Sequence, residues 1–151
     1  MTGATARNYV LHGLTVDSDI PLPVPLGSRA AAPGLRLVQA PAGSDLAGNG
    51  HRVAASFPRP GEPPAALFHR PSSVVVRFAG VADIRIAEDA TEVTVAPVQG
   101  ADEDLLLDLV LGLPFAYILL RRHLLPVHAS AVAYGAGSAV LVAPSLTGKS
   151  T

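Results

Sequence analysis

The chain has 151 residues, of which 49% are hydrophobic, and its eleven Lys and Arg against twelve Asp and Glu leave a formal net charge of -1. This length and composition suffice for the core of one ordinary domain. The balanced charge, without long single-sign runs, shows no basic patch of the kind that binds nucleic acid or a membrane surface. The absence of cysteine excludes disulfide scaffolds, thiolate metal sites and cysteine nucleophiles.

The compartment expected from the sequence is the cytoplasm. A cysteine-free chain suits a reducing compartment, and the N-terminal MTGATARNYV lacks an apolar run of signal-peptide length. The most apolar run, Leu109 to Leu120, holds only 12 residues. A membrane-spanning helix needs about 20 residues, so a buried helix is the better interpretation.

The first hundred residues predict short strands separated by turn-forming residues. The alternating prolines Pro21, Pro23 and Pro25 remove ladder donors and indicate extended coil or a sheet edge. Residues 40–50 and 58–64, rich in Gly, Pro, Ser and Asp, predict surface loops. Together the strands suggest a small antiparallel sheet with a hairpin connection at 88–90. The expected strands are Tyr9 to Val16, Leu35 to Val38, Ala66 to Arg70, Ser73 to Ala79, Ala82 to Ala87 and Thr91 to Ala96.

A different pattern begins at Asp102, where three acidic residues precede a Leu-rich run. Negative charge is favourable at a helix N-terminus, so a mostly buried helix is predicted. Pro114 either kinks this helix or starts a second one. Two strands, Val127 to Ala133 and Ser138 to Val142, are expected after it, joined by a glycine-containing turn.

The last residues resemble a phosphate-binding loop. Against the pattern G-x-x-x-x-G-K-[ST], residues 143–150 read A-P-S-L-T-G-K-S, so that Ala143 replaces the first glycine while Gly148, Lys149 and Ser150 match. Such a loop cradles phosphates with backbone N–H groups, meets the outer phosphates with its lysine and ligates Mg²⁺ through its hydroxyl. A predicted buried strand, SAVLV, leads directly into it, and Lys149 is the only lysine of the chain. A solvated turn is the alternative.

Two segments resemble the HPr kinase/phosphorylase-like family: LLPVHASAVAYGAGSAVLVAPSLTGKST at 124–151 and YVLHGLTVDSDIPLP at 9–23. The resemblance implies an α/β chain, with a β-rich region at 1–100 followed, at 101–151, by a helix and the first strands of a P-loop kinase core of the HPr kinase/PEP carboxykinase type. Only the N-terminal portion is matched, and the family's catalytic acids would lie beyond Thr151. The chain is therefore expected to be truncated at the Walker A motif, inactive alone and at most a weak ATP binder.

The function implied by the resemblance is that of an ATP-dependent serine kinase, acting with Mg²⁺ on a serine hydroxyl of a protein or peptide. Homo-oligomers are a further implication. His128 would lie near the phosphates, although a core histidine bonded to a backbone carbonyl is an equal alternative. The nucleotide and its metal would be held by the loop residues, with Ser150 as the Mg²⁺ ligand: Ala143, Pro144, Ser145, Leu146, Thr147, Gly148, Lys149, Ser150 and Thr151.

Two departures keep other functions open. Ala143 is a tolerable replacement, but Leu146 stands where the family usually has glycine, and a positive φ there would strain the loop. A non-catalytic module that binds a peptide or carrier protein is therefore the alternative, and a carboxykinase-type enzyme of small molecules is a third. The remaining histidines (His12, His51, His69 and His123) lack metal-ligand spacing. The acidic pairs at 17–19 and 102–104 are better explained by a turn and a helix N-terminus than by acid-base chemistry.

Overall fold

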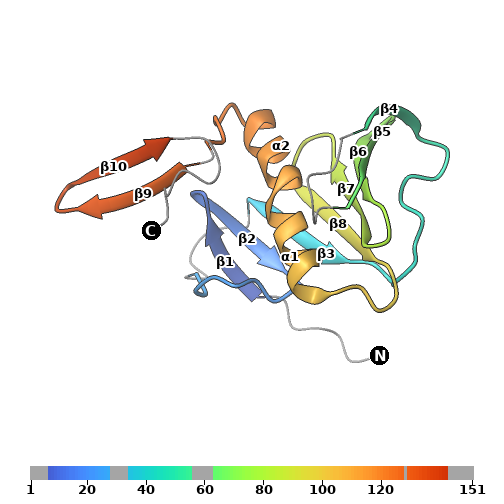
Figure 1. Ribbon diagram of the computed structural model, residues 1–151, viewed down its shortest axis with the longest axis horizontal. Helices are drawn as coiled ribbons and strands as arrows, with labels where there is room; N and C mark the ends of the chain where they lie inside the picture. Colours follow the sequence, from blue (N-terminus) through green and yellow to red (C-terminus); the bar gives the residue numbers. More distant parts are fainter. Residues whose placement is uncertain (1–6, 28–33, 56–62, 128, 143–151) are drawn as a thin grey trace.

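The computed structural model describes residues 7–27, 34–55, 63–127 and 129–142. They form one eight-stranded mixed sheet, two consecutive helices packed against it, and a separate two-stranded hairpin (Figure 1). The strands of the large sheet are β1 (Arg7–Leu11), β2 (Leu14–Ser18), β3 (Leu35–Gln39), β4 (His51–Ala55), β5 (Ala65–Arg70), β6 (Ser73–Phe78), β7 (Ala82–Ala87) and β8 (Glu92–Pro97). The helices are α1 (Glu103–Leu111) and α2 (Leu113–Arg121), and the hairpin consists of β9 (Ala129–Tyr134) and β10 (Gly137–Val142).

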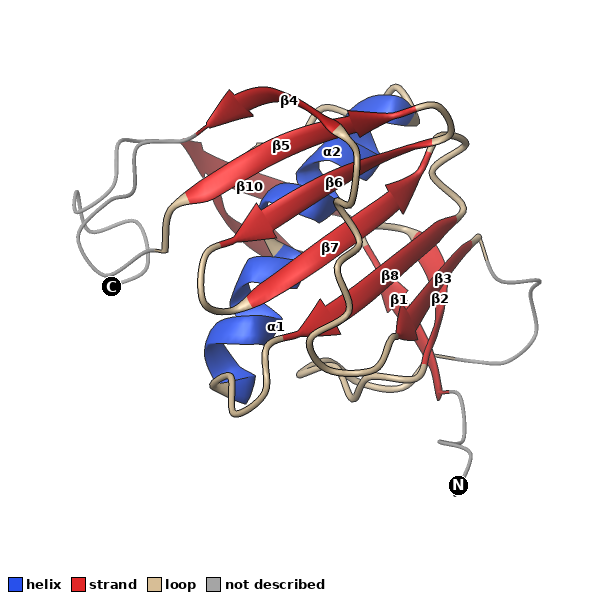
Figure 2. Cartoon of the chain, turned by 90° about the vertical axis from the view of Figure 1, so that its right-hand side faces the viewer, coloured by secondary structure: helices blue, strands red, loops and turns tan. Residues whose placement is uncertain are grey.

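The sheet has the order β1-β2-β3-β8-β7-β6-β5-β4. Strands β4 to β8 form an antiparallel meander, in which each strand pairs with the next along the chain. Strand β3 pairs in parallel with both β2 and β8, so the N-terminal hairpin β1–β2 joins the far side of the meander. The connection at residues 40–50 must therefore cross the whole meander to reach β4 (Figure 2).

The segment predicted as one strand from Tyr9 to Val16 is in fact a hairpin. His12 (φ 51°) and Gly13 (φ 78°) both adopt left-handed backbone conformations, which is what a two-residue type I′ turn requires. Glycine adopts this conformation at little cost, and histidine is among the residues that tolerate it best. The chain therefore reverses between Leu11 and Leu14, and β1 pairs antiparallel with β2.

The helices begin and end where the sequence signals predict. Asp102 caps α1, since its carboxylate accepts a hydrogen bond of 2.8 Å from the backbone N–H of Leu105. Gly112 ends α1, and Pro114 lies in the first turn of α2, where its missing N–H costs nothing. Of the two alternatives for Pro114, the start of a second helix is correct.

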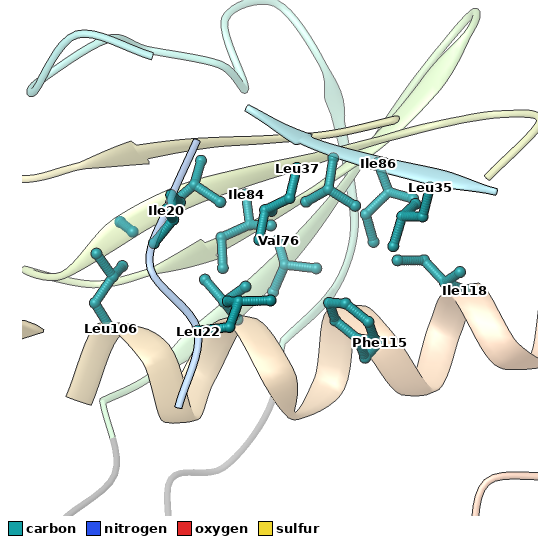
Figure 3. Close-up of a cluster of buried hydrophobic side chains, with 14 of the residues drawn as sticks. Ile20, Leu22, Leu35, Leu37, Val76, Ile84, Ile86, Leu106, Phe115 and Ile118 are labelled. Atoms are coloured by element: carbon teal, nitrogen blue, oxygen red, sulfur yellow. The ribbon is translucent and has the colours of Figure 1, made fainter. Parts of the chain in front are cut away.

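The core lies between the helices and one face of the sheet (Figure 3). On α2, Phe115, Ile118 and Leu119 are spaced by three and four residues, so they share one buried stripe. Along the central strands every second residue points to this stripe. The strand residues in this layer include Val16, Leu35, Leu37, Val76, Ile84, Ile86, Val93 and Val95, each at most 1% exposed.

The expected α/β class, with the first strands of a P-loop kinase core from residue 101, is wrong for the described chain. Among the described residues the strands dominate, and the two nine-residue helices follow one another directly. A P-loop core needs several helices that alternate with parallel strands. The two strands predicted at 127–133 and 138–142, with a glycine-containing turn between them, are confirmed as β9 and β10 within a residue or two. They are joined by two residues and pair antiparallel, because so short a connection cannot join parallel strands.

The other element predictions divide into confirmed and missed ones. The strands predicted at 35–38, 66–70, 73–79, 82–87 and 91–96 are confirmed within a residue or two, as is the hairpin connection at 88–90. The strand β4 was not predicted, because HRVAA lacks an alternating pattern and all five residues are exposed. The sheet is also mixed and larger than the small antiparallel sheet expected.

The packing predicts that Ile118→Ala, which truncates a fully buried side chain at the helix–sheet interface, lowers the free energy of unfolding by about 2–5 kcal/mol. Leu120 is the next residue after the stripe but is 55% exposed, so it provides the control. Leu120→Ala should change stability by less than about 0.5 kcal/mol. Urea denaturation of both variants measures the difference. Equal losses in the two variants would contradict this assignment of the core.

Candidate functional site

The residues predicted to bind the nucleotide lie outside the described part of the chain. This holds for the whole loop from Ala143 to Thr151, including Lys149 and Ser150, and also for His128. The described residues closest to the loop in sequence are those of the hairpin β9–β10. The described surface nearest to the loop in sequence is therefore this hairpin and the groove next to the segment that leads to it.

The hairpin leads directly to the first residue of the loop. Strands β9 and β10 pair in regular register from Tyr134 opposite Gly137 to Ala129 opposite Val142. Gly135 has φ 58° at the first position of the two-residue turn, where a type II′ turn favours glycine. Strand β10 ends at Val142, so that Ala143 follows the strand without an intervening residue.

Both faces of the hairpin carry exposed apolar side chains. Because side chains alternate along a strand and the register is known, Val132, Tyr134 and Leu141 share one face while Val140 and Val142 share the other. All five are more than half exposed, and Tyr134 is 90% exposed. Apolar residues on both faces are typical of strands covered on both sides. Within the described chain, β9 and β10 pair only with each other.

A groove of about 650 Å³ lies between the helices, the tip of the β1–β2 hairpin and the segment that leads to β9. Among the described residues that line it, only His12 has a side chain that can ionise, and its ring centroid lies 6.3 Å from that of Phe115. A volume of this size and a mostly apolar wall with few polar groups are typical of binding sites. Its remaining wall is formed by Leu111, Gly112, Ala116, Leu119, Leu124, Leu125, Pro126 and Val127.

A smaller apolar cavity of about 280 Å³ lies beside the edge strand β4. Strands β4 and β5 supply alanines to its wall, and α2 contributes Leu113 and Tyr117. None of the described residues that line it is charged. The described wall therefore offers shape and apolar surface but no group for chemistry.

The opposite face of the sheet carries a charged cluster that holds the 40–50 connection. Asp83, only 7% exposed, accepts hydrogen bonds from the backbone N–H groups of Leu46 (3.0 Å) and Ala47 (3.3 Å). Arg77 donates to both oxygens of Asp83, at 2.6 and 2.7 Å, and also to Asp45 at 2.5 Å. Every oxygen of the buried carboxylate is therefore satisfied, and the cluster is a structural clamp rather than a reactive site.

The charge states of this clamp follow from its contacts. The backbone N–H of Gly48 and the guanidinium of Arg77 lower the pKa of Asp45 below its usual 3.8. Hydrogen bonding to Asp83 raises the pKa of Arg77 further above its already high value. Both groups are therefore charged at neutral pH.

The described residues contain no group of three His, Cys, Asp or Glu side chains that could hold a metal ion. His12, His51, His69 and His123 are all exposed, and of these His51 and His69 lie directly opposite each other on β4 and β5. Asp102 caps α1, as its position before the helix indicates. In the described part of the chain, no helix is long and apolar enough to cross a membrane.

The sequence did not predict the groove. Its wall is formed by the turn at His12, the helices α1 and α2, and the segment 124–127. Residues so far apart in sequence form no local motif. The available signals were the turn formers His12 and Gly13 and the run of exposed apolar residues after α2, such as Leu125. These signals indicate a turn and an uncovered surface, but not that the two adjoin.

Comparison with family models, curated proteins and solved structures gives no match for this chain.

The clamp gives a prediction for pH dependence. An Asp45 carboxylate with a lowered pKa stabilises the fold above the unfolded-state pKa of 3.8, and this contribution is lost as the pH falls through the folded-state pKa. Asp45→Asn should therefore lower Tm at pH 7, and the difference from wild type should shrink as the pH falls below about 3.8. Thermal denaturation followed by circular dichroism measures both.

The matched control is Asp108→Asn on the exposed side of α1, since no described residue forms a salt bridge with Asp108. A Tm difference for Asp45→Asn that stayed constant between pH 7 and pH 3, or that equalled the control at pH 7, would contradict the role of the carboxylate charge.

Proposed function

We propose that this chain carries the phosphate-binding loop of an ATP-dependent kinase, related to HPr kinase/phosphorylase, that transfers the γ-phosphate to a serine hydroxyl of a protein or peptide. The observation that carries the proposal is the strand β10, which ends at Val142 immediately before A-P-S-L-T-G-K-S. A strand that leads into the loop supports a phosphate loop over a chance G-K-[ST] triplet. The burial expected for this strand is not seen, because all six residues of β10 are exposed within the described chain. The proposal concerns this loop and requires no α/β core among the described residues.

Each loop residue has a chemical role in this proposal. The backbone N–H groups of the loop from Ser145 to Lys149 bind the phosphate oxygens, and the ammonium of Lys149 neutralises the charge on the outer phosphates. The hydroxyl of Ser150 holds Mg²⁺, which shields the phosphate charges when bound. His128, the residue before β9 in the sequence, is proposed to lie near the phosphates. The proposed compartment is the cytoplasm.

A non-catalytic module that binds a peptide or carrier protein is the second candidate. Leu146 favours it, because leucine at a position of positive φ would weaken the loop. The described architecture also favours it, since the large groove beside α2 is mostly apolar and none of the described residues that line it has a carboxylate that could act as a base. The two candidates differ in whether the protein binds ATP.

Replacement of the lysine tests the kinase proposal. In the intact protein, Lys149→Ala should weaken the binding of ATP–Mg²⁺ by roughly 10-fold or more, because it removes a charged hydrogen-bond donor worth about 1.5–3 kcal/mol. Isothermal titration with ATP–Mg²⁺ measures the affinity, and mass spectrometry first confirms that the protein corresponds to its full reading frame.

Arg52→Ala, an exposed basic residue on β4, serves as the charge-matched control and should leave ATP affinity unchanged. If the wild-type protein fails to bind ATP–Mg²⁺, the kinase proposal is wrong and the binding module becomes the better one. If ATP binds equally to wild type and Lys149→Ala, the loop is not the nucleotide site.

The Leu146 position gives a second test. If the loop needs a positive φ there, Leu146→Gly relieves strain of roughly 1–3 kcal/mol, and affinity for ATP–Mg²⁺ should rise by roughly 5- to 150-fold. Leu146→Ala keeps the Cβ atom and should give no comparable gain. A Leu146→Gly protein with unchanged or weaker affinity would show that leucine fits the loop without strain.

A further inference from the structure

Two histidines that are distant in sequence are brought together by the pairing of β4 with β5. His51 is the first residue of β4 and lies directly opposite His69 of β5 in the antiparallel register. Directly opposite residues have their side chains on the same face of the sheet, with Cβ atoms about 4.5–5.5 Å apart. Both side chains are exposed, and β4 is an edge strand of the described sheet (Figure 2), so the pair is accessible from solution.

Contacts just before β4 hold this register. Arg70 follows His69 directly on β5. Its guanidinium donates to the carbonyls of Leu46 (2.7 Å) and Ala47 (3.3 Å) in the connection that leads to β4. A Cβ atom at Gly50 would lie only 3.2 Å from Cγ of Arg70 and 2.9 Å from the carbonyl oxygen of Ala47, so glycine allows this close approach. The chain therefore enters β4 in a position that β5 determines, and the backbone places the two histidines.

The nearest positive charges lie on the other face of the sheet. Arg52 and Arg70 are the neighbours of the two histidines in sequence, so the alternation along each strand directs their side chains away from the pair. Among the described residues, neither His51 nor His69 has a hydrogen-bond, ion-pair or ring partner for its side chain. Both imidazoles therefore have ring nitrogens available to a ligand that approaches from solution.

We propose that His51 and His69 form a binding site for one divalent transition-metal ion such as Zn²⁺, Ni²⁺ or Cu²⁺. Neutral imidazole is a preferred ligand of these ions, whereas Mg²⁺ and Ca²⁺ prefer oxygen ligands. A Zn–N bond is about 2.0–2.1 Å long, so the two ring nitrogens must converge to roughly 3 Å, which opposed side chains of this length allow. Two protein ligands leave the other coordination positions to water. Sequence spacing does not reveal such a pair, because its ligands meet only across two strands.

A metal ion at this position joins the edge strand to the interior of the meander. All five residues of β4 are exposed, so this strand has little apolar burial to hold it. An ion that binds the paired strands, but not the unfolded chain, stabilises the folded state by mass action. The inference is therefore a metal-dependent stabilisation of this edge of the sheet.

Isothermal titration with ZnCl₂ tests the inference on the complete 151-residue chain without a histidine tag. The wild type should bind one Zn²⁺ per chain at micromolar concentrations, and excess Mg²⁺ should not compete. His51→Ala and His69→Ala should each weaken Zn²⁺ binding by roughly 10-fold or more, since even the loss of an outer-shell partner of a metal ligand has an effect of this size. Zn²⁺ should also raise Tm for the wild type but not for either variant.

Two kinds of control test the placement of the ligands. His12→Asn and His123→Asn each remove an imidazole elsewhere and keep a residue that tolerates the positive φ of these positions, so Zn²⁺ affinity should not change. Arg52→His, added to His51→Ala, moves the imidazole by one residue and hence to the other face of the sheet, where it should not restore binding. Circular dichroism checks that each variant remains folded.

NMR signals of the histidine rings identify the ligands directly. Of the five histidines, only His51 and His69 should show ring signals that shift with Zn²⁺. The proposal is overturned by a wild type that does not bind Zn²⁺, by full affinity after loss of either histidine, by restoration through Arg52→His, or by ring shifts at other histidines instead. The test uses neither ATP nor the loop at 143–151, so its outcome is separate from that of the proposed kinase function.

Discussion

The packing of the two consecutive helices α1 and α2 against one face of the sheet is the interaction on which the rest of the molecule depends. Phe115 and Ile118 of α2 are almost completely buried in the core, together with residues of the N-terminal strands β2 and β3 and of β7 in the meander. The N-terminal hairpin and the meander therefore share a single hydrophobic layer. Arg122 at the end of α2 adds polar contacts, because its guanidinium donates to the carbonyls of Gly34 and Ala90, the latter at 2.8 Å.

The second face of the sheet is held in a different way. The connection at 40–50 crosses it, and buried Asp83 and partly buried Arg77 bind the backbone and Asp45 of this connection. One face thus depends on apolar burial and the other on a charged clamp whose buried carboxylate is fully hydrogen-bonded. The clamp explains why an oppositely charged pair, Asp83 and Arg77, lies directly opposite on β7 and β6.

Local signals predicted most of the local structure, although the turn at His12 and Gly13 was missed. Alternation over Ala82 to Ala87, the cap at Asp102 and the proline at 114 each determine an element through contacts within a few residues, and the structure follows them. The pairing of β3 with β8 depends on a distant partner, so the sequence could not indicate it. Strand β4 was missed because its five exposed residues show no alternating pattern. The α/β expectation came from a resemblance carried by β9 and β10, whose two-residue turn makes them a hairpin.

For the candidate site, the sequence and the structure contribute different parts. The proposed phosphate loop is recognisable from sequence because its motif lies in eight consecutive residues, with Lys149 and Ser150 at fixed spacing. The groove beside α2 is visible only in the structure, since His12 and Phe115 approach each other across about a hundred residues of chain.

The strand order also has a consequence for how the chain folds. The meander from β4 to β8 consists of neighbours along the chain, whereas β3 finds its second partner only in β8, at the far end of that meander. Contacts between residues close in sequence form first, because closing a long loop costs more entropy. During synthesis, the hairpin β1–β2 and strand β3 therefore leave the ribosome before the surface that receives them exists. Their apolar residues stay exposed until Glu92 to Pro97 have emerged, which makes this early interval the time at which the chain is most open to misassociation.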